Sequence, residues 1–152
     1  MKEKLAPLTG KISNHLFSCD VIVVIQQSEH IEDCAILLSF YNFKSDDKTL
    51  LDMFMREFND IEFIFSSEWL EENDLTDEFK KSLMDYSLSD TFSFQTTHES
   101  NSEYIHYDAN KKEFRAGISI PNDEIEDSCV FRLSDKKDTI IKNMLDTFKQ
   151  HL

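Results

Sequence analysis

The first strongly apolar segment of the chain runs from Val21 to Ile25 and consists of β-branched residues. Stiff, branched side chains pack well on a pleated surface, so the segment is predicted to be a strand. A second apolar segment, Cys34 to Phe43, follows after a polar link. Two such runs predict an antiparallel hairpin. Their nearly continuous hydrophobicity predicts central strands that are covered on both faces.

A helical period begins after this hairpin. Ser45 is the expected N-cap, with Asp46 and Asp47 in the first turn, where the helix dipole favours negative charge. One apolar helical face follows, formed by Leu50, Leu51, Phe54, Met55 and Phe58. A short strand is then expected from Ile61 to Phe65.

Two more helices are predicted further along the chain. The first has Asp74 or Thr76 as its N-cap and an apolar face made of Leu75, Phe79, Leu83 and Tyr86. Ser134 is the expected N-cap of the last helix, whose apolar stripe consists of Ile140, Ile141, Met144, Leu145, Phe148 and Leu152. The charged residues of this helix alternate in sign and are typical of a solvated face: Asp135, Lys136, Lys137, Asp138, Lys142, Asp146 and Lys149.

Between Tyr86 and Ser134 the hydrophobic period changes to two. Apolar and polar residues alternate around Phe92 and Phe94, and a further strand is expected from Tyr104 to Tyr107. The alternation returns at Phe114, Ala116, Ile118 and Ile120, stops at Pro121, and resumes over Cys129, Phe131 and Leu133. These half-solvated segments predict an antiparallel meander.

The pattern as a whole predicts an α+β fold. We expect a single domain, with a mainly antiparallel sheet of about five to six strands and about three helices. Residues 1–18 are mildly basic and weakly periodic, and are expected to form a tail or a short N-terminal helix before a domain that spans residues 19–152. Because the chain has only two glycines, Gly10 and Gly117, its turns are expected to rely on Asn, Asp and Ser.

The sequence lacks the motifs of common nucleotide-binding and metal-binding sites. Two isolated glycines rule out the phosphate-binding loops of nucleotide-binding enzymes. The best metal-ligand candidates are His98, Glu99, His106 and Asp108, but solvent-facing histidines on a sheet are the favoured interpretation. We therefore expect no cofactor, no metal and no enzymatic activity.

The cysteines and the apolar runs favour an intracellular protein. Cys19, Cys34 and Cys129 are odd in number and widely spaced, so inert thiols are favoured, although one bridge plus a free thiol stays open. Cys34 lies four residues after His30 but within an apolar strand, which favours a structural thiol over a nucleophile. The longest strongly apolar run is far shorter than the ~20 residues of a membrane helix, so a soluble, cytoplasmic protein is expected.

Negative charge is concentrated in one third of the chain. Between Glu57 and Asn110 there are fourteen Asp and Glu residues and only two cations, Lys80 and Lys81, a net charge of −12; the remainder carries −2. Such a field attracts cationic surfaces and repels nucleic acid and anionic membranes. Inside this segment a tryptophan is surrounded by acids, which is typical of a binding hot spot: Glu68, Trp69, Glu71, Glu72, Asp74, Asp77 and Glu78.

Charge alone then favours a protein inhibitor. The first hypothesis is an immunity or antitoxin protein that places these acids in the basic cleft of a nuclease-like bacterial toxin, as a monomer or a homodimer. The first alternative is a secretion or folding chaperone that binds an extended client on apolar patches, although each predicted helix has a single core-facing stripe. The second is a DNA mimic, which would need carboxylates along an elongated face.

Overall fold

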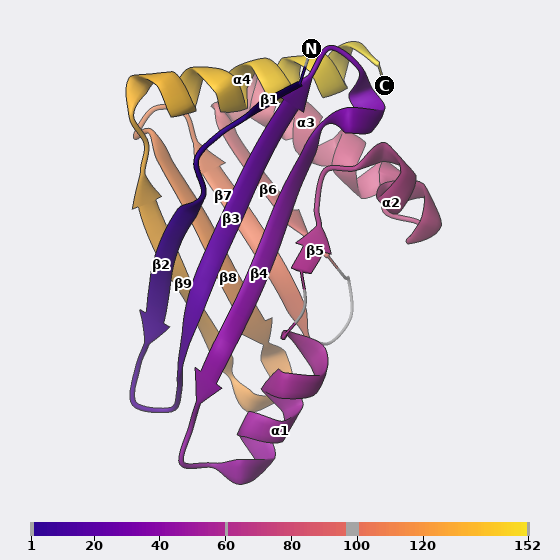
Figure 1. The fold of residues 1–152 in the computed structure, drawn as a ribbon. Coiled ribbons are helices and arrows are strands. Elements are labelled where there is room, and N and C mark those ends of the chain that lie inside the picture. The colour runs from indigo at the N-terminus through magenta and orange to yellow at the C-terminus, as the bar shows by residue number, and fades with distance from the viewer. Residues whose placement is uncertain (1, 60, 97–100, 152) are drawn as a thin grey trace.

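The body of the protein consists of two antiparallel sheets that lie one over the other, with helices at their ends (Figure 1). The structure is a computed structural model that describes residues 2–59, 61–96 and 101–151. The first sheet has five strands and the second has four. The predicted single-domain α+β fold with antiparallel pairing is confirmed, and the described residues form more strands and one more α-helix than expected.

The first sheet is built around the predicted hairpin. Its two long strands, β3 (Ser18–Ser28) and β4 (Ala35–Lys44), pair antiparallel, with Val24 opposite Leu37. The short η1 (Ile31–Asp33) joins them, and β5 (Ile61–Phe63) extends the sheet beyond β4. The other edge of β3 is shared by β1 (Lys2–Lys4) and β2 (Leu8–Ser13).

Two predictions for this sheet are wrong. Residues 1–18 contain β1 and β2 in place of a tail or a short helix, because Leu8 and Ile12 both reach the core when β2 pairs with β3. The hairpin is also not covered on both faces. Val21, Val23 and Ile25 are fully buried, whereas the intervening Ile22 and Val24 are only half-buried on the outer face.

The second sheet is the predicted meander. Its strands β6 (Thr91–Gln95), β7 (Ser102–Asp108), β8 (Glu113–Ile120) and β9 (Ile125–Arg132) pair in chain order. The single-turn η2 (Pro121–Asp123) separates β8 from β9, so Pro121 ends its strand as expected. The alternating apolar residues, including Phe92, Phe94 and Phe114, face the core.

Four α-helices form from the described residues: α1 (Lys48–Glu57), α2 (Ser67–Glu72), α3 (Thr76–Ser89) and α4 (Asp135–Gln150). Ser134 caps α4 as predicted, since its hydroxyl accepts a hydrogen bond from the Lys137 N–H. The predicted cap of α1 is wrong: Asp47 accepts from the Leu50 N–H at 3.1 Å, while Ser45 donates to the Leu16 carbonyl at 2.8 Å.

The entry into α3 also differs from the prediction. Leu75 occupies the N-cap position without a capping side chain, and neither Asp74 nor Thr76 has that role. Asp74 instead adopts a left-handed conformation, with φ 55°, between α2 and α3. The short α2, which was not predicted, is capped by Ser66. The Leu75 N–H donates to the Leu70 carbonyl at 2.8 Å, which makes the α2–α3 turn tight.

Aromatic rings attach the helices to the two ends of the sheets. At the α1 end, Phe54 stacks on Phe43 with ring centroids 4.8 Å apart. At the other end, one cluster joins residues from α3, α4, β6 and the segment before α2: Phe65, Phe79, Phe92, Phe94 and Phe148. Phe79 of α3 lies 5.0 Å from Phe148 of α4, so these two helices share a single aromatic core.

A buried polar contact ties α4 to the second sheet. Asp138 is only 3% exposed and accepts a hydrogen bond from the Tyr107 hydroxyl of β7. Its other carboxylate oxygen lies 3.1 Å from the Lys142 amine. The prediction that Asp138 lies on a solvated face is therefore wrong. Burial and the neighbouring Asp138 carboxylate together raise the pKa of Tyr107.

The two sheets meet most closely where β2 passes β9. A Cβ on Gly10 would lie 2.2 Å from the Cys129 sulfur and 2.9 Å from the Phe131 ring, so only glycine fits there. Nearby, the Asn14 amide donates to the Asp127 carboxylate at 2.7 Å. Gly10 is therefore required by the close packing of β2 on β9. Its backbone conformation does not require glycine, since neither glycine of the chain has a positive φ.

Left-handed turn positions are occupied mostly by the residues that were expected. Asn42, Asp74 and Asp90 have positive φ, as short polar side chains tolerate this region. Lys112 and Glu124 have it as well, which propensity does not explain.

Candidate protein-binding surface

Five acids gather on α2, the α2–α3 turn and the first turn of α3. We call them the acidic corner: Glu68, Glu71, Glu72, Asp74 and Asp77. All five side chains are exposed. The tight turn at residues 73–75 brings the two helices together, and Figure 1 shows α2 projecting at the edge of the molecule beside α3. Of the two other predicted contact residues, Glu78 is half-buried with an interaction of its own, and Trp69 is half-buried.

No lysine or arginine with described placement pairs with a carboxylate of the acidic corner. Within the part of the chain that the structure describes, none of its five carboxylates takes part in an ion pair or a side-chain hydrogen bond. The ion pairs of described residues lie elsewhere, including Arg56 with Glu57 and Lys112 with Asp135. The negative charge of the corner is therefore directed to solvent.

Part of this charge opposes helix stability. Glu71 and Glu72 lie in the last turn of α2, where the carbonyl end of the helix dipole is negative, and that turn has no basic residue. Asp77, in the first turn of α3, lies at the favourable end. Helix stability can therefore explain an acid at position 77, but it does not explain the acids at positions 71 and 72.

Trp69 does not project freely from the surface. Its side chain packs partly against the core, and it also lines a groove of about 280 Å³ between α1, α2 and the β6–β7 hairpin. The described residues that line this Trp69 groove are Glu57, Phe58, Trp69, Asn73, Thr96, Asn101, Ser102 and Glu103. Two of them are linked, because the Asn101 amide donates to the Glu57 carboxylate at 3.1 Å.

The Trp69 groove has the chemistry of a socket for one cationic side chain. Its volume is just below the roughly 300–1,000 Å³ of small-molecule pockets. A lysine or arginine is attracted to an aromatic ring, and Glu57 also lines the groove. Sequence reasoning identified Trp69 but missed Asn73, Thr96 and Asn101, because these residues converge from separate elements.

The acidic segment 57–110 does not form a single face among the residues described. Glu103 is only 4% exposed on β7, and Asp108 accepts hydrogen bonds from the Asn110 and Lys111 N–H groups in the β7–β8 turn. Asp85 and Asp90 are exposed further along α3. The acidic corner is therefore the coherent part of the charge block.

The histidine candidates do not assemble a metal site in the described chain. His98 and Glu99 lie outside the described residues. His106 Nδ1 lies 2.6 Å from the Ser93 hydroxyl, across β6 and β7. Among the residues with described placement, no three His, Cys, Asp or Glu side chains are arranged to hold a metal ion.

All three cysteines are free and buried, as the first interpretation predicts. Burial raises the pKa of the Cys19 thiol to about 12, and burial also raises the pKa of Cys34 and Cys129. Cys34 contacts the Ser28 backbone, where its sulfur accepts from the N–H at 3.3 Å. Cys34 lies at the C-cap of η1, just before β4, and not within the strand as predicted, but its complete burial favours a structural thiol.

Two exposed apolar residues were missed. Met84 and Leu88 are 69% and 88% exposed on the solvent face of α3. The expectation that each helix has only one, core-facing stripe is therefore wrong for α3, and it is wrong for α1 as well, because Met55 of the predicted apolar face is 51% exposed. Met84 and Leu88 lie four residues apart, and Lys80 lies four residues before Met84, so all three fall on one face of a helix. This spacing could have predicted the exposed pair.

No family model, curated protein or solved structure matches this chain. Across the described residues, the longest and most apolar helices still fall short of what crossing a membrane requires.

Proposed function

We propose that this protein is an inhibitor of the immunity or antitoxin type, which binds a cationic, nuclease-like toxin domain through the acidic corner. The observation that carries the proposal is the set of five exposed carboxylates that have no partner among the residues the structure describes. A basic active-site cleft that normally holds phosphates offers the complementary charge. On this proposal the chain acts by blocking access and has no catalytic role.

The Trp69 groove supplies specificity on the same side of the molecule. Interfaces usually combine a small desolvated anchor site with a charged rim that steers the encounter. Here a lysine or arginine of the toxin would enter the groove beside Trp69 and Glu57, while the acidic corner faces the surrounding basic cleft. The unfavourable position of Glu71 and Glu72 at the end of α2 supports selection for binding over stability.

The direct test uses the product of the reading frame adjacent to this gene. Association rates are measured at several salt concentrations for the native chain and for Glu71→Lys/Glu72→Lys. We expect the double variant to associate at least about 10-fold more slowly at low salt and to show a flatter salt dependence, because steering by opposite charge is lost.

A matched control is Asp52→Lys/Glu126→Lys, which makes the same change in net charge at exposed positions on α1 and β9. The control is expected to keep most of the native association rate. Equal slowing of both variants would show that net charge, and not the acidic corner, determines binding. An adjacent protein that binds with unaltered kinetics to Glu71→Lys/Glu72→Lys contradicts the proposed surface.

The second candidate function is a client-binding chaperone, and Met84 and Leu88 on α3 favour it. An apolar client segment would bind to these side chains, so its binding would survive high salt and be lost in Met84→Ser/Leu88→Ser. A toxin inhibitor would instead lose binding at high salt and keep it in Met84→Ser/Leu88→Ser. A binding titration of the adjacent gene product at low and high salt separates the two functions.

A further inference from the structure

The free edge of the second sheet has open backbone hydrogen-bonding groups. β6 is the end strand of this sheet, and among the described strands it pairs with β7 alone. At one end of the pairing the Ala109 N–H donates to the Asp90 carbonyl at 2.9 Å. At the other end the Thr96 N–H donates to the Glu103 carbonyl at 3.0 Å. The backbone groups of the even-numbered residues of β6 therefore point toward β7, and those of the odd-numbered residues point away from it.

The residues of β6 that face this edge are Thr91, Ser93 and Gln95. At Thr91 the edge is closed, because its N–H donates to the Ser89 hydroxyl at 3.4 Å. For Ser93 and Gln95, neither the N–H nor the carbonyl has a hydrogen-bond partner among the residues that the structure describes. Both residues are exposed, so two donors and two acceptors are open to solvent along one edge.

This edge also lacks the usual protection against strand pairing. Natural proteins blunt an edge strand with a lysine, a proline, a bulge or a very short strand. β6 reads Thr-Phe-Ser-Phe-Gln, has no charge and no proline, and pairs with β7 without a register shift. At the edge of the first sheet, by contrast, β5 has only three residues. An open, uncharged edge fits an extended segment of another chain, which pairs with it through main-chain hydrogen bonds.

Two hollows beside β6 would receive the side chains of an added strand. One has a volume of about 420 Å³ and is lined by residues of all four strands of the sheet, among them Ser93, Gln95, Tyr104, His106, Arg115 and Glu126. The other is the Trp69 groove, which is lined by Thr96, the residue directly after β6. A segment that follows this edge would therefore pass from the larger hollow to the groove.

We propose that an extended segment of the cationic partner pairs with β6 and adds a further strand to the second sheet. This inference rests on the proposed function, because it concerns how the same partner binds. Ser93 and Gln95 would supply main-chain hydrogen bonds, and the two hollows would select side chains. The acidic corner steers the encounter, whereas the paired strand slows dissociation. A second copy of this chain fits less well, because two chains of net charge −14 repel one another.

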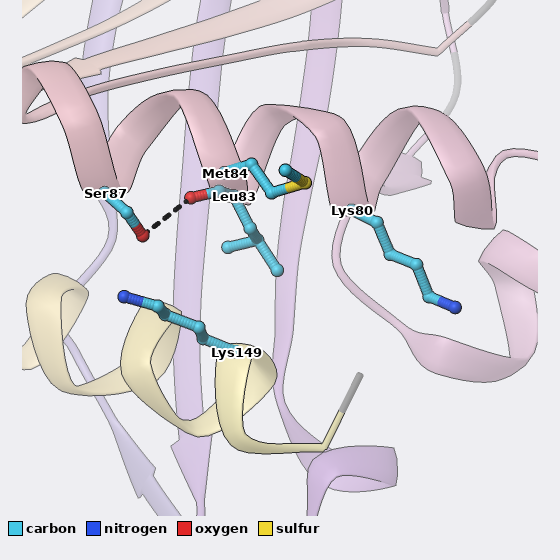
Figure 2. Close-up of a pocket in the computed structure, with 5 residues that line it drawn as sticks. All are labelled: Lys80, Leu83, Met84, Ser87 and Lys149. Carbon is cyan, nitrogen blue, oxygen red and sulfur yellow. Dashed lines mark hydrogen bonds between the residues drawn. The ribbon is translucent and has the colours of Figure 1, made fainter.

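The groove beside the exposed residues of α3 differs from this edge. It has a volume of about 200 Å³, and Figure 2 shows it between α3 and α4, with the Leu83 side chain between Lys80 and Lys149. The Ser87 hydroxyl in this groove donates to the Leu83 carbonyl at 3.1 Å, within the helix. The side chains of this groove do not specify an extended partner, whereas the open backbone groups of β6 do.

The test is the dissociation rate of the complex with the product of the adjacent reading frame, at roughly 0.05 and 0.5 M NaCl. Ser93→Pro removes an N–H that points away from β7, at an edge position where proline is tolerated. We expect its complex to dissociate at least about 10-fold faster at both salt concentrations, because main-chain pairing is short-ranged. The effect of Glu71→Lys/Glu72→Lys is expected to shrink at the higher salt, since it acts through long-range charge.

The matched control is Ser93→Ala. This variant loses the same hydroxyl, which lies 2.6 Å from His106 Nδ1, but keeps the N–H at the edge. Its complex is expected to dissociate within about 2-fold of the native rate. Gln95→Pro and Gln95→Ala form a second matched pair on the same edge, so a variant that fails to fold in thermal melts can be replaced.

A second readout is amide exchange at the edge, measured by NMR. The N–H groups of Ser93 and Gln95 are expected to exchange at least about 10-fold more slowly in the complex than in the free chain. A complex that leaves both amides unprotected, or in which Ser93→Pro behaves like Ser93→Ala, overturns the added strand but leaves the acidic corner as the binding surface. Failure of the adjacent protein to bind at all overturns both proposals. Protection that grows with the concentration of the chain alone shows a second copy on β6 and also overturns the added strand.

Discussion

The helices α3 and α4 share one aromatic core but use their outer faces in different ways. On α4, every large apolar residue from Ile140 to Phe148 is buried, and Asp138 is paired with Tyr107 and Lys142. On α3, Met84 and Leu88 are exposed, and the helix begins at the acidic corner, whose carboxylates have no partner within the described ranges. The apolar residues of α4 are explained by folding, whereas Met84 and Leu88 on the outer face of α3 gain no burial within the described chain.

The largest expected effect comes from truncating the shared aromatic core. Phe148→Ala on α4 should lower the free energy of unfolding by about 3–5 kcal/mol, because it removes a fully buried ring and leaves a cavity. Leu88→Ala on α3 should change it by less than about 0.5 kcal/mol. Urea unfolding of both variants measures the difference. Similar losses in the two would mean that Leu88 is covered in the folded protein.

The next effect concerns the buried polar contact of α4. Tyr107→Phe removes the hydroxyl that donates to Asp138 and should cost about 1–3 kcal/mol, because the carboxylate stays buried. Tyr41→Phe is a suitable control, since Tyr41 lies on the surface at 37% exposure. Chemical denaturation of both proteins gives the two free energies. If Tyr107→Phe is as stable as the control, the contact does not hold α4 in place.

A smaller effect tests whether the acidic corner opposes stability. Glu71→Lys/Glu72→Lys should raise the free energy of unfolding by about 0.3–1 kcal/mol, because cations suit the carbonyl end of α2. Asp77→Lys makes a charge reversal at the favourable end of α3 and should lower stability by a similar amount. Thermal melts at low salt compare the variants. A loss of stability in the double variant would contradict the proposed conflict between binding and folding.

The last prediction concerns the contact between α3 and α4 at high pH. Burial, followed by the nearby Asp146 and Asp90 carboxylates, raises the pKa of Tyr86 from 10.0 to about 12. The unfolded chain therefore loses this proton first, so the contribution is fully present below pH 10 and is lost as the pH rises toward 12. Tyr86→Phe should lose stability less steeply than the native chain over this range. If the free energies of unfolding of the two proteins fall in parallel over this pH range, the raised pKa of Tyr86 is contradicted.

Local periodicity predicted much of the fold. The β3–β4 hairpin, the β6–β9 meander and α4 with its Ser134 cap follow from patterns that lie within a few neighbouring residues. The short elements β1, β2 and α2 were missed, because three to six residues contain too little periodicity to stand out. Their stability comes from pairing with β3 or from packing beside α3, which are tertiary contacts.

The candidate site, like the fold, was predicted from the sequence only in part. The sequence located the acidic residues around Trp69, because composition records charge directly. It did not reveal that Trp69 lines a groove with Asn73, Thr96 and Asn101, since these residues meet only after folding. It also treated Asp138 as solvated, because an alternating charge pattern looks the same whether or not β7 reaches the helix.

By itself the sequence determined the strand and helix periods, the concentration of negative charge and the absence of glycine-rich chemistry, all properties of neighbouring residues. Only the tertiary structure decided which of the described carboxylates lack partners, that Trp69 lines a groove and that Met84 and Leu88 remain uncovered. Exposure and pairing depend on what other elements bring to a residue, and residues distant in sequence supply those contacts.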